Sequence, residues 1–223
     1  MNSDFILQFA SSFATRLNQE AQGKVDSSII EGLNLVLPEN ALSNGNPWSY
    51  GYGHVNQEVE SEIAPVVFTP YPFFGSNTWK GGEKVPDEKL GFSFLNKTSG
   101  HTGSLHLSPI RRWTSPIKGK VQIKGNVHHQ SNNGDGVRLT LHSSRVGQLG
   151  QWSVKHGGQD YDITVDVEPG DTLDAIVDMI DNYTSDSFSN VYKISVLESE
   201  SKLAWDSEAD FHGHLDLSAY ELK

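Results

Sequence analysis

Several short segments of this chain alternate apolar and polar residues with a period of two, and this alternation is the strongest constraint on its fold. Val121, Ile123 and Val127 alternate with charged and amide side chains. The same period runs through residues 137–142 and 161–168. Because successive side chains of a β-strand point to opposite faces, each segment is predicted to be a strand with one buried face and one wet face.

Turn-forming residues separate these segments. Clusters of Gly, Pro, Asn, Asp and Ser stand at 44–47, 131–136 and 169–171, and no helical period lies between them. A parallel sheet would require crossover helices and would bury both faces of its strands. We therefore predict a mainly β fold, an antiparallel, jelly-roll-like β-sandwich, over residues 40–198.

The flanks of this domain follow other patterns. Residues 3–22 and 25–37 carry apolar side chains at spacings of three and four, which predicts two amphipathic helices. A glycine follows the first and a proline the second, so we expect an N-terminal helical hairpin over residues 1–39. Acidic residues with scattered apolar ones fill residues 199–223, where we expect an acidic C-terminal extension.

Composition excludes several functions. The chain has no Cys, which removes disulfides, thiolate metal sites, Cys nucleophiles and iron–sulfur clusters. With 17 Lys+Arg against 28 Asp+Glu, the net charge of −11 repels a phosphate backbone, so we expect no nucleic-acid partner. No apolar run approaches the roughly 20 residues that span a bilayer, and no signal peptide is recognisable, so we expect no membrane span.

Catalytic motifs are also missing. The chain has no G-x-S-x-G elbow, no H-E-x-x-H and no phosphate-binding loop that ends in Lys-Ser or Lys-Thr. A carboxylate pair for glycoside hydrolysis could be assembled from Glu58, Glu60 or Glu62 and the acids of residues 160–186, but any chain with 28 acidic residues permits such a pair. We therefore expect no enzymatic activity.

An acidic stretch points to a cation. Nine acidic residues and no Lys or Arg lie from Asp160 to Asp186, and carboxylates are ligands that Ca²⁺ prefers. No EF-hand spacing is present, and alternating Asp residues usually form the solvated face of a strand. The candidate Ca²⁺ ligands are Asp178, Asp181 and Asp186, because short side chains and backbone carbonyls of one loop can converge there.

Aromatic residues offer a second kind of site, because an exposed ring can stack on a sugar while polar neighbours hold its hydroxyl groups. Trp113 alternates like a core residue and is expected inside. Tyr52 and Trp79 lie near loops and are expected to be exposed. The candidate ligand-binding residues are Tyr52, Trp79, Trp152, Asn133 and Asp135.

An ordered set of motifs carries a family resemblance. The motifs are Asn46-Pro47-Trp48-Ser49-Tyr50-Gly51-Tyr52, Thr78-Trp79-Lys80-Gly81, Arg112-Trp113-Thr114-Ser115-Pro116 and Pro169-Gly170-Asp171-Thr172-Leu173-Asp174. Together they resemble bacterial carbohydrate-binding-module-like β-sandwich domains. The flanks, at Met1–Phe5, Ala14–Leu17 and Trp205–Phe211, are similar to segments of planctomycete cytochrome c-type multidomain proteins of unknown function, into which such modules are inserted. The Cys-x-x-Cys-His haem motif of such proteins is absent here, so the resemblance implies no electron-transfer role.

The resemblance implies a non-catalytic carbohydrate-binding-like module of a larger bacterial protein, located in the periplasm, in the cell envelope or secreted. Its expected partners are a polysaccharide and the neighbouring domains of the same parent protein. The alternative is a structural or protein-interaction β-sandwich without a glycan ligand. Burial of Trp48, Tyr52, Trp79 and Trp152 discriminates between the two, since rings inside the core cannot stack on a sugar.

Overall fold

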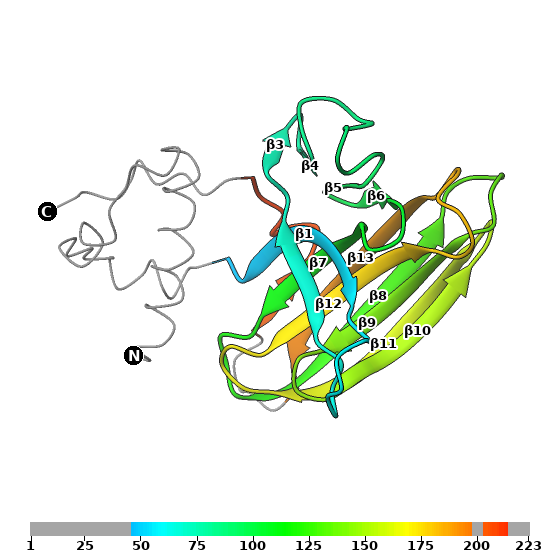
Figure 1. Ribbon diagram of the computed structural model, residues 1–223. Helices are drawn as coiled ribbons and strands as arrows, with labels where there is room; N and C mark the ends of the chain where they lie inside the picture. The colour runs from blue at the N-terminus through cyan, green and yellow to red at the C-terminus, as the bar shows by residue number, and fades with distance from the viewer. Residues whose placement is uncertain (1–45, 198–202, 214–223) are drawn as a thin grey trace, which may run out of the picture. The chain divides into compact units, whose positions relative to one another are not determined.

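The computed structural model describes residues 46–197 and 203–213, and all of these belong to one compact unit. They form β-strands arranged in two antiparallel sheets, which confirms the prediction of a mainly β, antiparallel sandwich (Figure 1). The helical hairpin expected over residues 1–39 lies outside the described residues. Within the described segments, no helix is long and apolar enough to cross a membrane.

Six strands form the first sheet, here called sheet A. Its spatial order is β10 (Gly147–Val154), β9 (Val137–Ser143), β12 (Thr172–Met179), β7 (Ser108–Thr114), β1 (Trp48–Val55) and β2 (Val66–Pro70). Eight strands form sheet B. Its order is β11 (Gly158–Val167), β8 (Gly119–His129), β13 (Ser187–Val196), β6 (Ser99–His101), β5 (Phe94–Asn96), β4 (Thr78–Lys80) and β3 (Phe73–Gly75), with β14 (Ala204–Asp206) also paired to β13.

Inward-facing side chains of both sheets build the core. In sheet A, Trp48 pairs with Trp113, which in turn pairs with Leu173, so the register places three large apolar side chains in one row. Val121 and Ile123 of β8 are buried on the inner face of sheet B. The expectation that Trp113 lies inside is therefore confirmed, and the two-residue period explains the placement.

The outer face of sheet A is covered as well. We call residues 56–70 the strap. This segment ends in β2 and reaches the outer face, where Phe68 lies against the Arg112 guanidinium of β7 and the Ala64 backbone is hydrogen-bonded to His142 of β9. A Cβ at Gly51 would lie 2.7 Å from the Phe68 ring, so only glycine permits so close an approach. β2 itself is the edge strand of that sheet and pairs with β1 (Figure 1). As a result, Ile110 and Ile176 are buried although they point away from the core.

Residues 203–213, which the sequence places in the acidic extension, pack on the sandwich. Trp205 of β14 pairs with Ile194 of β13, and its ring centroid lies 5.0 Å from that of Trp113. Ser207 is buried and its Oγ accepts a hydrogen bond from the Tyr192 backbone N–H at 2.8 Å. This segment therefore supplies side chains to the core and one wall of the pocket described next.

Candidate functional site

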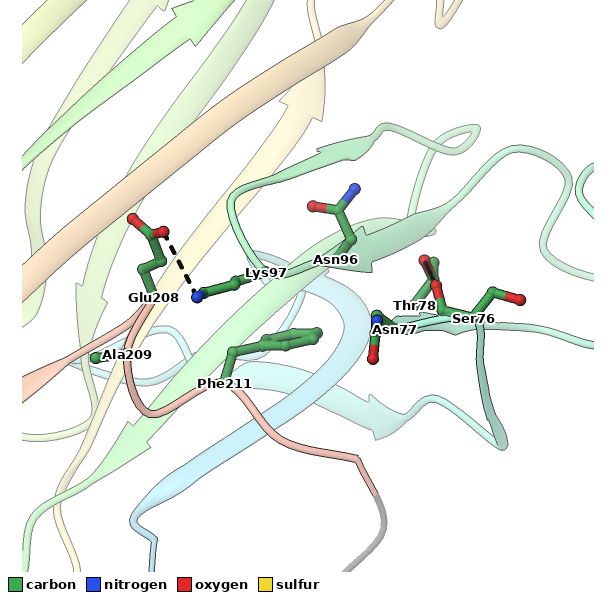
Figure 2. Close-up of a pocket in the computed structure, with 8 residues that line it drawn as sticks. All are labelled: Ser76, Asn77, Thr78, Asn96, Lys97, Glu208, Ala209 and Phe211. Atoms are coloured by element: carbon green, nitrogen blue, oxygen red, sulfur yellow. Dashed lines mark hydrogen bonds and ion pairs between the residues drawn. The ribbon is translucent and has the colours of Figure 1, made fainter.

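A pocket of about 410 Å³ opens where three segments meet (Figure 2). The segments are the β3–β4 turn, the connection from β5 to β6, and the chain that follows β14. The lining residues are Ser76, Asn77, Thr78, Asn96, Lys97, Glu208, Ala209 and Phe211. Hydroxyl, amide and charged groups thus surround a single aromatic ring, a composition that suits a polar ligand with one apolar face.

The β3–β4 turn is shaped by two left-handed residues. Ser76 and Asn77 have φ values of 52° and 55°, which gives the two-residue hairpin turn that matches the twist of paired strands. Asn tolerates this backbone conformation better than most residues. Within the described residues the Asn77 side chain makes no hydrogen bond, so its amide group is available to a ligand at the pocket wall.

The β5–β6 connection is held by Asn96. Its Oδ1 accepts hydrogen bonds from the backbone N–H groups of Thr98, at 3.1 Å, and Ser99, at 2.8 Å, and from the Ser99 hydroxyl at 3.0 Å. These bonds fix the turn and direct Lys97 toward the opposite wall. There Lys97 Nζ lies 3.7 Å from Glu208 Oε1, and the two side chains are 56% and 47% exposed.

The third wall is a tight turn stabilised by two aspartates. Asp206 Oδ1 accepts hydrogen bonds from the backbone N–H groups of Glu208 and Ala209, at 2.9 and 3.0 Å. Asp210 Oδ2 accepts one from the Asp206 N–H at 2.7 Å. The Phe211 ring then packs edge-on against Tyr50, with centroids 4.8 Å apart, and lines the pocket.

Arg111 lies beneath the pocket and connects its walls. This buried guanidinium donates to the carbonyl oxygens of Asn96 and Lys97, at 3.0 and 3.2 Å. It also donates to the carbonyls of Asn190 and Ser207, at 3.2 and 3.4 Å. One side chain therefore fixes two pocket segments against β13, which makes Arg111 a positioning residue.

No sequence motif singles out Arg111, although the strand period contains a signal for it. Trp113 was expected inside, and the two-residue period of a strand places Arg111 on the same face. The pocket residues Lys97, Glu208 and Phe211 carried no comparable signal. They lie far apart in the sequence, and only tertiary packing brings them together.

Two of the aromatic residues expected to bind a ligand, Tyr52 of β1 and Trp79 of β4, face the interior. Trp79 is only 7% exposed, so the expectation that it is exposed was wrong. Its ring stacks on Tyr50 with centroids 5.9 Å apart, and its Nε1 donates to the His212 carbonyl at 2.8 Å. The chain after β14 covers it. Tyr52 is half-buried and packs against Tyr71 at 5.6 Å.

Trp152 lies elsewhere, at the sandwich edge formed by β10 and β11. It is half-buried and stacks on the inward-facing Tyr161, with centroids 5.1 Å apart and ring planes at 23°. Trp48 is buried. The structure therefore does not bring Tyr52, Trp79 and Trp152 together on one concave face, and their rings pack mainly on other aromatic residues.

Asp135 and Asp186 form a second polar cluster, between the β8–β9 and β12–β13 loops. Asp135 Oδ2 accepts hydrogen bonds from the backbone N–H groups of Asp181, at 2.7 Å, and Asn182, at 3.1 Å. Asp186 is fully buried and its Oδ2 accepts the Thr102 hydroxyl at 3.1 Å. Burial, and secondarily the charge of Asp135, raises the pKa of Asp186 to about 6.

Of the other two carboxylates expected to bind Ca²⁺, Asp178 lies apart from this cluster, and Asp181 joins it through its backbone N–H. Asp178 forms a two-point ion pair with Arg138, at 3.1 and 2.7 Å. The side chain of Asp181 is exposed, and Asn133, expected to bind a ligand, is exposed in the β8–β9 loop. Across residues 46–197 and 203–213, no three His, Asp or Glu side chains gather as a metal site.

Comparisons with known proteins add likenesses of fold. No protein-family model matches the sequence, and no curated protein matches it. The solved structures that it resembles include a module pair, CBM51-2 and INT, from Clostridium perfringens ZmpB, at 10% identity and a TM-score of 0.31, over 63% of this chain and 25% of that one.

Two further structures show the range of these likenesses. One is the carbohydrate-binding module CBM6cm-2 from Cellvibrio mixtus lichenase 5A in complex with cellotriose, at 15% identity and a TM-score of 0.24, over 44% of this chain and 86% of that one. Another is rabbit GITRL, at 12% identity and a TM-score of 0.29, over 39% of this chain and 70% of that one. Likenesses this distant decide neither the ligand nor the activity of this chain.

Proposed function

We propose that this β-sandwich is a non-catalytic carbohydrate-binding-like module and that the pocket of Figure 2 holds a saccharide. The observation that carries the proposal is the pocket itself. It combines the Asn77 amide, the Lys97–Glu208 ion pair and the Phe211 ring around about 410 Å³. Amide and charged groups can hold sugar hydroxyls, and an aromatic ring can pack on the apolar face of a pyranose.

The pocket does not favour hydrolysis of the bound sugar. Glycoside hydrolysis usually requires two carboxyl groups on opposite sides of the scissile bond. Among the residues that the structure describes, Glu208 is the only acidic one that lines the pocket, and it is paired with Lys97. We therefore assign the module to binding, as part of a larger bacterial protein in the periplasm, in the cell envelope or secreted.

A glycan array probed with the purified chain, followed by calorimetric titration of each hit, tests the proposal. Asn77→Gly removes the amide while keeping the left-handed backbone that the turn requires. Lys97→Met removes the charge and keeps most of the side-chain volume. Each change is expected to weaken binding about 10-fold or more, because a hydrogen bond to the ligand is lost.

A matched control separates this pocket from the loop that the sequence indicated. Asn133→Gly removes an exposed amide from the β8–β9 loop and is expected to leave affinity unchanged. If Asn133→Gly abolishes binding while Asn77→Gly does not, the saccharide binds at the loop and the pocket assignment is wrong.

The second candidate is a structural or protein-interaction module, and the burial of the aromatic residues favours it. Trp48 and Trp79 are buried, and no group of exposed rings forms a stacking platform among the residues that the structure describes. A blank array from a chain that unfolds cooperatively would support this candidate and contradict the proposed saccharide.

A further inference from the structure

We propose that Asp135 and Asp186 bind one Ca²⁺ ion, which joins the β8–β9 loop to the β12–β13 loop. The proposal stands apart from the saccharide pocket, since none of its residues lines that pocket. Each of the two carboxylates has one oxygen engaged by the protein and one oxygen that is not. The unengaged oxygens carry the inference.

The unengaged atoms are Asp135 Oδ1 and Asp186 Oδ1. Both are buried and have no hydrogen-bond partner among the residues that the structure describes. Leaving a buried carboxylate oxygen unpaired is costly, so native proteins rarely contain one unless a water or ion fills its place. Two such atoms in one loop cluster concentrate negative charge, and a cation offsets that charge where a water molecule does not.

The backbone brings the two carboxylates together. Asp186 Oδ1 lies 3.5 Å from the position that a Cβ would take at Gly134, the residue before Asp135. Gly134 has a φ of 88°, and the same Cβ would lie 2.6 Å from the Thr184 carbonyl oxygen. The β8–β9 loop can therefore approach the β12–β13 loop this closely only with glycine at this position.

The ligand set favours Ca²⁺ among the common cations. Both side-chain ligands are hard oxygen donors, and in the described part of the chain no Lys or Arg forms an ion pair with either carboxylate. With two carboxylates available, backbone carbonyls and water must complete the coordination. Such mixed ligand sets on loops suit Ca²⁺, which tolerates irregular geometry, better than Mg²⁺, which requires an octahedron.

Calorimetric titration of the full chain with CaCl₂ at pH 7.5, after dialysis against EDTA, tests the proposal. We expect one saturable site. At a Ca²⁺ concentration 100-fold above Kd, the thermal midpoint should rise by about 5–10 °C relative to EDTA. Absence of both heat and a midpoint shift at 10 mM Ca²⁺, on the order of the weakest extracellular sites, would overturn the proposal, as would a stronger response to MgCl₂.

Isosteric variants make the test specific. Asp135→Asn and Asp186→Asn are each expected to abolish the Ca²⁺ response, whereas Asp181→Asn, which removes an exposed carboxylate from the same loop, should retain it. In EDTA, Asp186→Asn should be at least as stable as the parent chain, because it removes a buried charge beside Asp135. With Ca²⁺, the order should reverse. A variant that is less stable than the parent chain in EDTA would contradict the cation site.

Discussion

The outer faces of the two sheets differ in what covers them, although both arise from the same alternating pattern. On sheet A, Arg112 and Asp174 form a two-point ion pair at 2.7 and 2.9 Å beneath the strap, and the Asp174 side chain is fully buried. On sheet B, Lys124 and Asp162 pair at 3.0 Å, with side chains 60% and 49% exposed. Alternation therefore determines which residues leave the core, and it does not determine whether they meet water.

The strap changes the energetics of the charges below it. The Arg112 guanidinium lies 4.2 Å from the centroid of the Phe68 ring, which belongs to the strap. A charged group that is shielded from water is stabilised mainly by its ion-pair partner. An exposed charged group that loses its partner is stabilised by water instead. Equivalent substitutions on the two outer faces should consequently change the free energy of unfolding by very different amounts.

Asp174→Asn should have the largest effect. It leaves the Arg112 guanidinium beneath Phe68 without a counter-charge, and breaking one partner of a buried pair costs about 3–5 kcal/mol. Denaturant titration of the parent chain and the variant measures this loss as a fall in the midpoint at constant m-value.

The double variant Arg112→Met with Asp174→Leu is the control for Asp174→Asn. Because it removes both charges and fills their volume, it should recover much of the lost stability. If Asp174→Asn is nearly neutral, the strap does not exclude water and the contrast between the faces fails.

Much of the fold followed from the sequence, because alternation and turn chemistry are local. Trp113 lies inside as the two-residue period predicts, and the turn at residues 169–171 lies between β11 and β12. The strap was not predictable in this way. Nothing in residues 56–65 indicates that they cross a sheet, since the contacts that hold them there, from Ala64 to His142 of β9 and from Ile63 to Gly147 of β10, join residues far apart in the sequence.

Gly51→Ala should have the next largest effect, because it tests the strap directly. The added methyl group would meet the Phe68 ring and the Thr69 carbonyl, and such overpacking costs about 1–3 kcal/mol. Gly157→Ala is the matched control, since the nearest atom to its Cβ, the Lys155 carbonyl oxygen, lies 3.9 Å away. Equal midpoints for the two variants in denaturant would show that β2 does not press on β1.

His142→Gln should have a smaller, pH-dependent effect. Burial lowers the pKa of His142, and the Asp174 carboxylate and the Ala64 backbone offset part of this, while Arg112 adds to it. Because the pKa of His142 is lower in the folded chain than in the unfolded chain, the unfolded chain binds more protons at this position below a pH of about 6.5. The contribution of neutral His142 to stability is therefore present above that pH and is lost as the pH falls.

Stability measured at pH 7.5 and 5.5 checks this expectation. The parent chain should lose more stability on acidification than His142→Gln does. His128→Gln, on the exposed face of sheet B, should lose as much as the parent chain. An identical pH dependence for His142→Gln and the parent chain would mean that the imidazole below the strap reaches water.

The candidate sites were less predictable than the fold, for a physical reason. Asp178 and Asp186 look alike in the sequence, yet Arg138 pairs with the first, while no Lys or Arg among the described residues pairs with the second. Trp79 lies beside a turn, as an exposed residue would, but it is buried and its Nε1 donates to the carbonyl of His212, in the segment after β14. Both outcomes depend on partners more than 30 residues away, and a local pattern holds no information about them.

Lys124→Met and Asp162→Asn on sheet B should have the smallest effects. Both side chains stand in water, and Gln122 Nε2 also donates to Asp162 at 2.8 Å, so the Asp162 carboxylate keeps a partner when Lys124 is lost. Each variant should shift the thermal midpoint by less than about 3 °C, and 0.5 M NaCl should reduce even that difference, because salt screens exposed pairs. A double-mutant cycle compares the two faces on one scale. The coupling energy of Lys124 and Asp162 should be much smaller than that of Arg112 and Asp174. If the two coupling energies are equal, desolvation beneath the strap does not explain the difference between the faces, and a property shared by both sheets must stabilise their charge pairs.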